Sequence, residues 1–128
     1  MAAPIRVHAI DHVTLVVRDL ERSRQFYGDL LGMTPTERPA FKFDGLWFQD
    51  GATQIHLIDE HADSGPAGVR RADGLSISRT AHVAFEVDDA LAARDRLEES
   101  GLTLADGPKQ RPDGPTQIYV LDPDRHLI

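Results

Sequence analysis

An alternating pattern of apolar and polar residues marks the beginning of the structured chain. Residues 7–17 read VHAIDHVTLVV, and within them Val13, Leu15 and Val17 share one phase of a two-residue period. That period is typical of a β-strand whose two faces differ. Because a helix packed on the sheet would cover the apolar face, His12 is expected to point to the opposite, helix-free face.

A helix is predicted to follow this strand. Asp19 is a favourable N-cap residue, and Gly32 is of the residue type that commonly ends a helix. Pro35 would prevent the helix from continuing. The residues between the two ends supply one apolar face, formed by Leu20, Phe26, Tyr27, Leu30 and Leu31.

Two further strands are predicted around the dipeptide Asp50-Gly51, which is a strong signal for a hairpin turn. Residues 41–49 and 53–58 on either side are rich in aromatic and branched side chains. His56 lies in the second segment, where a polar ring in an apolar strand needs a partner. The first half therefore reads as a strand, a helix and about three strands.

The same pattern restarts about 70 residues after its first appearance. The segment HVAFEVDDALAARDRLEESGLTL aligns with HVTLVVRDLERSRQFYGDLLGMT with one deletion, and the alignment places His82 on His12. Val83, Phe85 and Val87 repeat the apolar phase of the first strand. His82 is thus expected on the helix-free face, where a curved sheet would bring both imidazoles into one concave pocket.

The rest of the second half is expected to complete the repeat. Its elements are a helix capped by Asp88 or Asp89 and ended by Gly101, a strand over 116–121, a turn over 122–125 and a last strand from about His126. We therefore predict an α+β fold of two tandem βαβββ modules, forming a curved, cup-like mixed sheet with helices on the outer face. A single domain over residues 1–128 is expected, with module one at about 5–59, a linker at about 60–79 and module two at about 80–128.

The segment from residue 59 to residue 80 contains several glycines and charged residues and little periodicity, as expected of an exposed linker. A loop of this length in a compact domain is either a lid or binding segment, or a plain exposed connection. The pattern of residues leaves both interpretations open.

Composition narrows the classes of function. A formal net charge of −7 disfavours binding to a phosphate backbone, so no nucleic-acid partner is expected. The sequence contains no cysteine, which excludes disulfides, thiolate metal sites and a thiol nucleophile. Residues 1–7 lack the apolar core of a signal peptide, and no run approaches the roughly 18 apolar residues of a membrane span. We expect a cytoplasmic protein without a membrane partner, acting on a small molecule.

Three histidines are the candidate metal ligands: His12, His56 and His82. Imidazole binds Zn, Fe, Ni or Cu well, and a set of three histidines calls for one carboxylate and an open position. The repeat places the equivalent of His56 one position beyond Ile128, so the fourth ligand is expected there. Glu86 lies roughly 13 Å along the strand from His82 and is expected to be a rim or solvated residue.

The remaining histidines are expected outside the site. His126 has the wrong strand parity for a ligand and is expected to be exposed beside the turn, while His8 and His61 are expected on the surface. Aromatic side chains could line an apolar pocket, and the candidates are Trp47, Phe48 and Tyr119.

Three blocks of sequence resemble a known superfamily: DHVTLVVRDLERSRQFYGDLLGM, HVAFEVDDALAARDRLEESG and IYVLDPDRHLI. In this order they resemble the vicinal oxygen chelate superfamily, also called the glyoxalase, bleomycin-resistance and dioxygenase superfamily. In the enzymes of that superfamily, ligands come from the first and fourth strands of each module. The resemblance therefore implies His12, His56, His82 and the position after Ile128 as ligands, the last one typically a glutamate.

The resemblance implies a metal-dependent enzyme, a glyoxalase I-like lyase or isomerase that acts on a small oxygenated substrate chelated to a divalent metal (Zn, Ni, Fe, Mn or Co). A thiol cosubstrate is compatible with it, and a homodimer is implied, with the site within one chain or shared between subunits. His56 would be both ligand and catalytic residue, but glyoxalase I enzymes usually place a glutamate at this position. An extradiol-type dioxygenase is an alternative, in which Tyr119 would be the catalytic tyrosine. A metal-free ligand-binding protein of the bleomycin-resistance kind is another.

Overall fold

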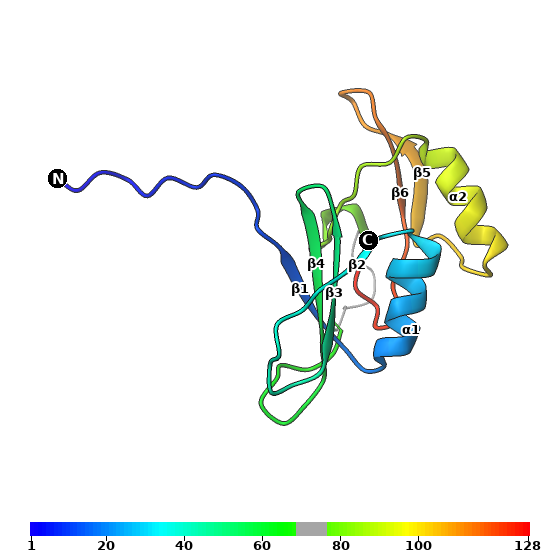
Figure 1. Cartoon of the computed structure of the whole chain (residues 1–128). Coiled ribbons are helices and arrows are strands. Elements are labelled where there is room, and N and C mark those ends of the chain that lie inside the picture. Colours follow the sequence, from blue (N-terminus) through cyan, green and yellow to red (C-terminus); the bar gives the residue numbers. More distant parts are fainter. Residues whose placement is uncertain (69–76) are drawn as a thin grey trace.

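The computed structural model describes residues 1–68 and 77–128 and shows a mixed α+β fold (Figure 1). A four-stranded sheet has the order β1-β4-β3-β2, and β5 pairs with β6 in a second sheet. The elements are β1 (Val13–Val17), α1 (Leu20–Arg24), η1 (Gln25–Leu30), β2 (Pro35–Thr36), β3 (Gly45–Asp50), β4 (Thr53–Asp59), η2 (Ile77–Arg79), α2 (Ala90–Glu99), β5 (Asp106–Gln110) and β6 (Thr116–Tyr119).

The four-stranded sheet is built from the first half of the chain. β1 runs parallel to β4. β3 runs antiparallel to β4, with Asp50 of β3 opposite Thr53 of β4. Gly51 has a φ of 57°, a conformation that glycine adopts without steric cost, which confirms the hairpin expected at Asp50-Gly51. β3 begins at Gly45, so the prediction of a strand from Phe41 was wrong. The segment before Gly45 instead packs its aromatic rings around an arginine.

The first helical segment has the predicted ends. The Asp19 side chain accepts hydrogen bonds from the backbone N–H groups of Glu21 and Arg22, which caps α1. The α-helix continues into the π-helical η1, and Gly32 follows with a φ of 73°. The sequence pattern predicted that the first strand includes residues 7–12, but β1 starts at Val13. That part of the prediction was wrong. Residues 7–12 are exposed, and the chain before residue 11 extends away from the body (Figure 1).

The second half forms its helix but not its first strand. Asp89 caps α2 by accepting from the backbone N–H groups of Leu91 and Ala92. Residues 82–87, predicted as a strand, are irregular, and the N–H of Val83 donates to the carbonyl of Leu127. The predicted last strand is reduced to one bridge between residues 121 and 127. β1 pairs along its whole length with β4, whereas the equivalent partner of residues 82–87 consists of only the final few residues.

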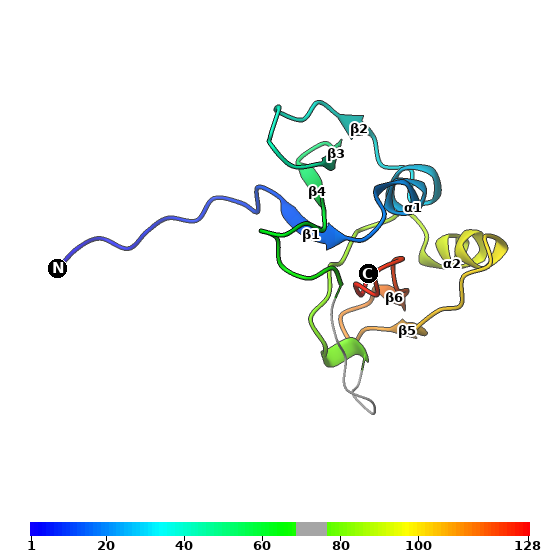
Figure 2. The same ribbon diagram turned by 90° about the horizontal axis from the view of Figure 1, so that it is seen from below.

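A single hydrophobic cluster joins the two halves. It includes Leu15 and Val17 of β1 and Leu57 of β4, which confirms the predicted buried face of the first strand. Leu97 of α2 and Val120 belong to the same cluster. Figure 2 shows the C-terminal segment between the two sheets, with α1 and α2 together on one side. No helix among the described residues is long and apolar enough to cross a bilayer.

A buried polar junction also ties the halves together. The Tyr27 hydroxyl donates to the Asp122 carboxylate at 2.6 Å, and the Nδ1 of His126 lies 2.8 Å from the same carboxylate oxygen. Burial raises the pKa of the Tyr27 phenol, and the Asp122 charge raises it further, so this phenol remains protonated. His126 is 7% exposed, so the prediction that it is exposed was wrong. The contact with the buried Asp122 carboxylate keeps the His126 ring in the interior.

Candidate functional site

The helix-free face of the four-stranded sheet carries a line of polar and aromatic side chains. Thr14 of β1, His56 of β4 and Trp47 of β3 lie in register across three neighbouring strands. The flanking residues of β4, Ile55 and Leu57, belong to the core. Strand alternation therefore places His56 on the helix-free face, which is the face expected for His12.

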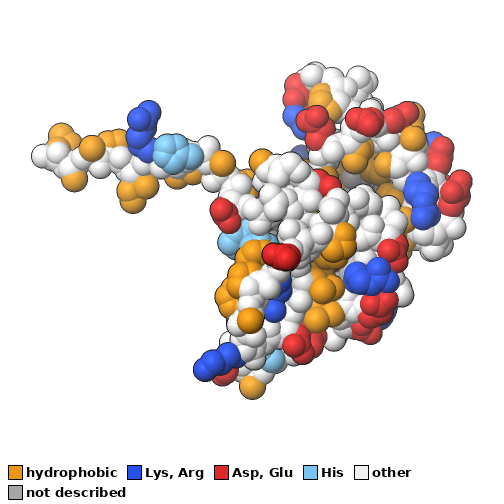
Figure 3. Space-filling view, in the orientation of Figure 1, with side chains coloured by type: hydrophobic (Ala, Val, Ile, Leu, Met, Phe, Trp, Pro, Cys, Tyr) orange, Lys and Arg blue, Asp and Glu red, His pale blue; other side chains and the backbone are white. Residues whose placement is uncertain are grey.

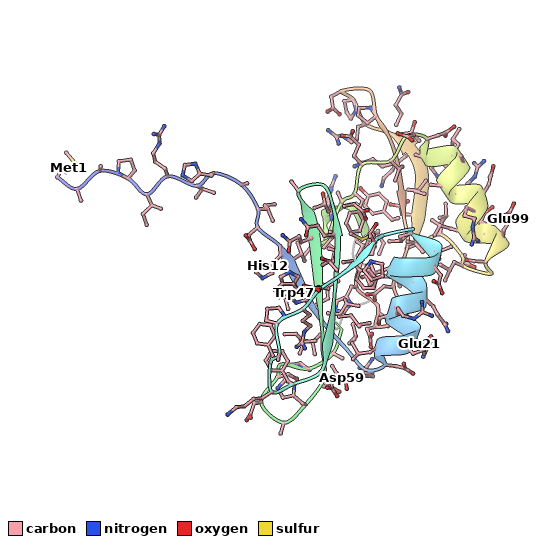
Figure 4. The ribbon with its side chains drawn as sticks, in the orientation of Figure 1. Met1, His12, Glu21, Trp47, Asp59 and Glu99 are labelled. Carbon is pink, nitrogen blue, oxygen red and sulfur yellow. The ribbon has the colours of Figure 1, made fainter. Side chains whose placement is uncertain are left out.

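The His56 ring is held between two other rings. Trp47 stacks on it with centroids 3.8 Å apart and planes 3° from parallel, and His12 stacks at 4.1 Å and 15°. Figure 4 shows His12 and Trp47 next to each other, on the side of the sheet away from α1. The structure thus brings together two of the three histidines expected to bind a metal.

The environment of His56 favours the neutral imidazole. Burial lowers its pKa below the ordinary value of 6.5, and the neighbouring His12 lowers it further. The Nε2 of His56 lies 3.0 Å from the side-chain oxygen of Gln54, while the Nδ1 of His12 lies 2.7 Å from the Asp11 carboxylate. A neutral imidazole is the form that binds metals and accepts protons.

A pocket of about 120 Å³ opens next to this pair. Figure 3 shows hydrophobic side chains, histidine and a basic side chain gathered on the corresponding side of the molecule. The pocket is lined by Thr14, Arg38, Phe41, Phe43, Trp47, His56 and Ile58. Its walls are therefore mostly apolar, with one imidazole, one hydroxyl and one guanidinium.

The third predicted ligand, His82, lies in different surroundings. It is exposed, and its Nδ1 is 2.6 Å from the carbonyl of Thr80. Its ring meets the edge of the buried Tyr119, with centroids 5.6 Å apart. The Tyr119 hydroxyl donates to the side chain of Gln117 at 3.3 Å, and the Nζ of Lys109 lies 5.2 Å from the ring centroid.

A divalent metal fits part of this arrangement. His12 and His56 are adjacent imidazoles on one face, which suits two of the ligands of a borderline cation such as Zn, Ni or Fe. Within the described part of one chain, however, no group of three or more His, Asp or Glu side chains is placed to hold a metal ion. The pair therefore fits as part of a metal site that needs further donors.

The sequence missed several residues of this face. Arg38 and the two phenylalanines that flank Lys42 lie in a segment without periodicity, and the only signal was the closely spaced aromatic pair itself. Trp47 lines the pocket as suggested, but Phe48 is buried in the core. Other expectations agree with the structure: His8, His61 and Glu86 are exposed. Residues 69–76 of the expected linker lie outside the described residues. The choice between a lid and a plain connection therefore stays a prediction.

Comparison with known proteins places these features in context. The Glyoxalase/Bleomycin resistance protein/Dioxygenase superfamily matches residues 9–128. The chain is 33% identical to a lactoylglutathione lyase of Haemophilus influenzae, over 91% of this chain and 87% of that protein. It is 32% identical to an ethylmalonyl-CoA/methylmalonyl-CoA epimerase of Cereibacter sphaeroides, over 72% and 70%. A crystal structure of a glyoxalase/dioxygenase from Nostoc punctiforme superposes with a TM-score of 0.76 at 28% identity, covering 100% of this chain and 92% of that one.

Proposed function

Because the chain belongs to the Glyoxalase/Bleomycin resistance protein/Dioxygenase superfamily, we propose that it is a metal-dependent lyase or isomerase of the glyoxalase I type. Its substrate would be a small oxygenated molecule that presents two neighbouring oxygens to a divalent metal. The observation that carries the proposal is the stacked pair of His12 and His56 beside a mostly apolar pocket. Relatives named as a lyase and an epimerase support the reaction class.

We propose that His12 and His56 hold the metal together with His82, and that His82 is supplied by the second copy in a homodimer. This arrangement accounts for the separate contacts of His82 within one chain. A bound divalent cation would stabilise the negative charge that develops on the substrate oxygens. The cation would be Zn, Ni, Fe, Mn or Co, and a thiol cosubstrate remains compatible with the site.

The chain's own residues would position the substrate and move a proton. The lowered pKa of His56 keeps its imidazole neutral, with one nitrogen lone pair. That lone pair would either bind the metal or, while His56 is released from the metal, accept a proton from the carbon next to a carbonyl. Trp47 covers one face of its ring and limits the access of water. Tyr119 contacts His82, and we propose it as the second catalytic residue, which would approach the site together with that histidine.

Metal binding by single variants tests the ligand set. We expect His12→Ala, His56→Ala and His82→Ala each to weaken binding of Zn²⁺ or Mn²⁺ by about 100-fold, because each substitution removes a side chain that binds the metal directly. His61→Ala is the matched control, since this histidine is exposed and contacts Phe43 rather than the His12–His56 pair. Calorimetric titration of the metal-free protein measures the effect. Failure of the unmodified protein to bind either metal would refute the proposal.

Mixing two variants tests whether the site is shared between copies. If His82 comes from the partner, a mixture of His12→Ala and His82→Ala regains about a quarter of the wild-type sites, because half of the randomly formed dimers contain one intact site of two. A site within one chain gives no recovery. Assays of hemithioacetal isomerisation and catechol cleavage on the metal-loaded protein then separate the lyase or isomerase from a dioxygenase.

A second candidate function is metal-free binding of a small molecule. It is favoured by the incomplete ligand set among the described residues of one chain and by the apolar lining of the pocket. Under this alternative, addition of a chelator would leave the ligand affinity of the unmodified protein unchanged.

A further inference from the structure

The pocket beside His56 contains a positive charge without a carboxylate partner among the described residues. Arg38 lines the pocket, and the ion pairs formed within residues 1–68 and 77–128 do not include it. Arg24, Arg94 and Arg111, in contrast, each contact a carboxylate. In a chain whose formal net charge is −7, Arg38 therefore places a positive charge at a pocket.

The position of the Arg38 guanidinium is fixed by its neighbours. Its central carbon lies 4.9 Å from the ring centroid of Phe41 and 5.0 Å from that of Phe43. Nη2 donates to the backbone carbonyl of Phe43 at 2.8 Å. Gly45 leaves room for the side chain, because a Cβ at this position would lie 2.9 Å from the Arg38 Nε. The charge is therefore held in place before any ligand arrives.

Within residues 1–68 and 77–128, most of the donor capacity of this guanidinium is unused. A guanidinium has about five N–H donors in a planar fork, and Arg38 makes one hydrogen bond within the described chain. Such a fork matches the two oxygens of a carboxylate. The adjoining rings of Phe41 and Trp47, tilted by 49° with centroids 6.2 Å apart, supply an apolar surface for a planar group.

We propose that Arg38 is the anion anchor of this pocket, and that the ligand is an aromatic or conjugated carboxylate. Its charged end would lie on Arg38, and its planar part would lie against Trp47 and Phe41. This orientation directs the rest of the molecule towards His56, which lines the same pocket. The inference rests on the proposed function for calling this ligand a substrate, but the binding step requires no metal.

The only tryptophan of the sequence lies in this pocket and provides the measurement. Trp47 fluorescence is titrated with benzoate, with the neutral isostere benzamide and with acetate, in the presence of a chelator. We expect saturable quenching by benzoate and at least about tenfold weaker binding of benzamide, which lacks the charge. Acetate should also bind about tenfold more weakly, because it lacks the planar ring.

Variants assign the preference to Arg38. We expect Arg38→Met to lower benzoate affinity about tenfold, to the level of benzamide, and Arg38→Lys to retain part of the preference. Arg94→Met is the control, because it removes a partly buried arginine from α2. Equal affinities for benzoate and benzamide in the unmodified protein, or an unchanged preference in a folded Arg38→Met variant, would overturn the proposal.

One further measurement shows whether a negative result comes from loss of the fold. Circular dichroism establishes whether Arg38→Met folds. If it does not, the comparison of benzoate with benzamide in the unmodified protein decides alone. Because the chelator removes any metal, loss of the carboxylate preference contradicts only the anion anchor, whereas loss of metal binding in the histidine experiment contradicts only the proposed enzyme.

Discussion

The two halves of the chain carry the same histidine at the same point of the repeat and place it in different surroundings. His12 stacks on His56 at the edge of a complete four-stranded sheet, whereas His82 is exposed and contacts the Thr80 carbonyl. The adjoining strands account for the difference. β1 has five residues in register with β4, but residues 82–87 meet the C-terminal segment through Val83. The repeated motif therefore predicts on which face of the strand the histidine lies. The contacts that the histidine makes depend on the neighbouring strand.

The largest expected difference between the halves is in amide hydrogen exchange. The β1 amides that face β4 belong to a paired strand, whereas residues 84–87 donate no backbone hydrogen bond to another described residue. We expect exchange at the β1 amides that face β4 to be slower by more than about 1000-fold relative to unstructured peptide, and exchange at 84–87 to be close to that reference rate. NMR exchange measurements give both values.

Slow exchange at residues 84–87 would contradict this comparison. It would mean that the segment is paired, and a dependence of the rate on protein concentration would identify a second copy as the partner. The helix α2, which follows the segment, serves as an internal reference because its amides are hydrogen-bonded within the helix.

A pair of truncations compares the packing of the halves. Leu57 in β4 is fully buried, whereas Val87, on the predicted apolar face of the second half, is 54% exposed. We expect Leu57→Ala to lower the free energy of unfolding by about 3 kcal/mol through lost burial and a cavity. Val87→Ala should change it by less than about 0.5 kcal/mol. Urea denaturation measures both, and equal losses would show that residues 82–87 are packed as firmly as the first sheet.

The smallest expected effect is on the titration of the first-half histidine pair. The pKa of His56 in the folded protein lies below its ordinary value of 6.5 because of burial and then the neighbouring His12. The unfolded chain therefore binds more protons as the pH falls below about 6.5, so this group makes the fold less stable on acidification until the folded-state pKa is passed. We expect His12→Ala to raise the pKa of His56, measured by NMR of its ring protons. An unchanged pKa would show that His12 does not interact with His56, and a lower pKa would show that His12 stabilises the charged imidazole instead.

Local signals in the sequence predicted much of the first half. The Asp19 cap, the helix end at Gly32 and the Asp50-Gly51 turn depend on a few adjacent residues, and each forms as expected. The alternation around Leu15 predicted the buried face of β1. It also predicted the helix-free face for His12, and His56 lies next to His12 there.

Features that depend on distant partners were not predictable in the same way. The burial of His126 depends on the carboxylate of Asp122, and the irregular course of residues 82–87 depends on how many partner residues lie beside them. The position of Arg38 at the pocket depends on loop packing against Phe41 and Phe43, which no periodicity describes. The alternation of residues predicted a face for His82, but it could not predict which residues His82 contacts.

The buried junction of Tyr27 and Asp122 affects how the protein responds to being cut in two. The hydroxyl comes from the first helical segment and the carboxylate from the turn of the second half. Separating the halves would leave an unsatisfied hydroxyl in one fragment and a carboxylate without this donor in the other. Although the sequence is duplicated, the repeats are therefore not interchangeable parts, and fragments expressed separately should recover the native state only on reassociation.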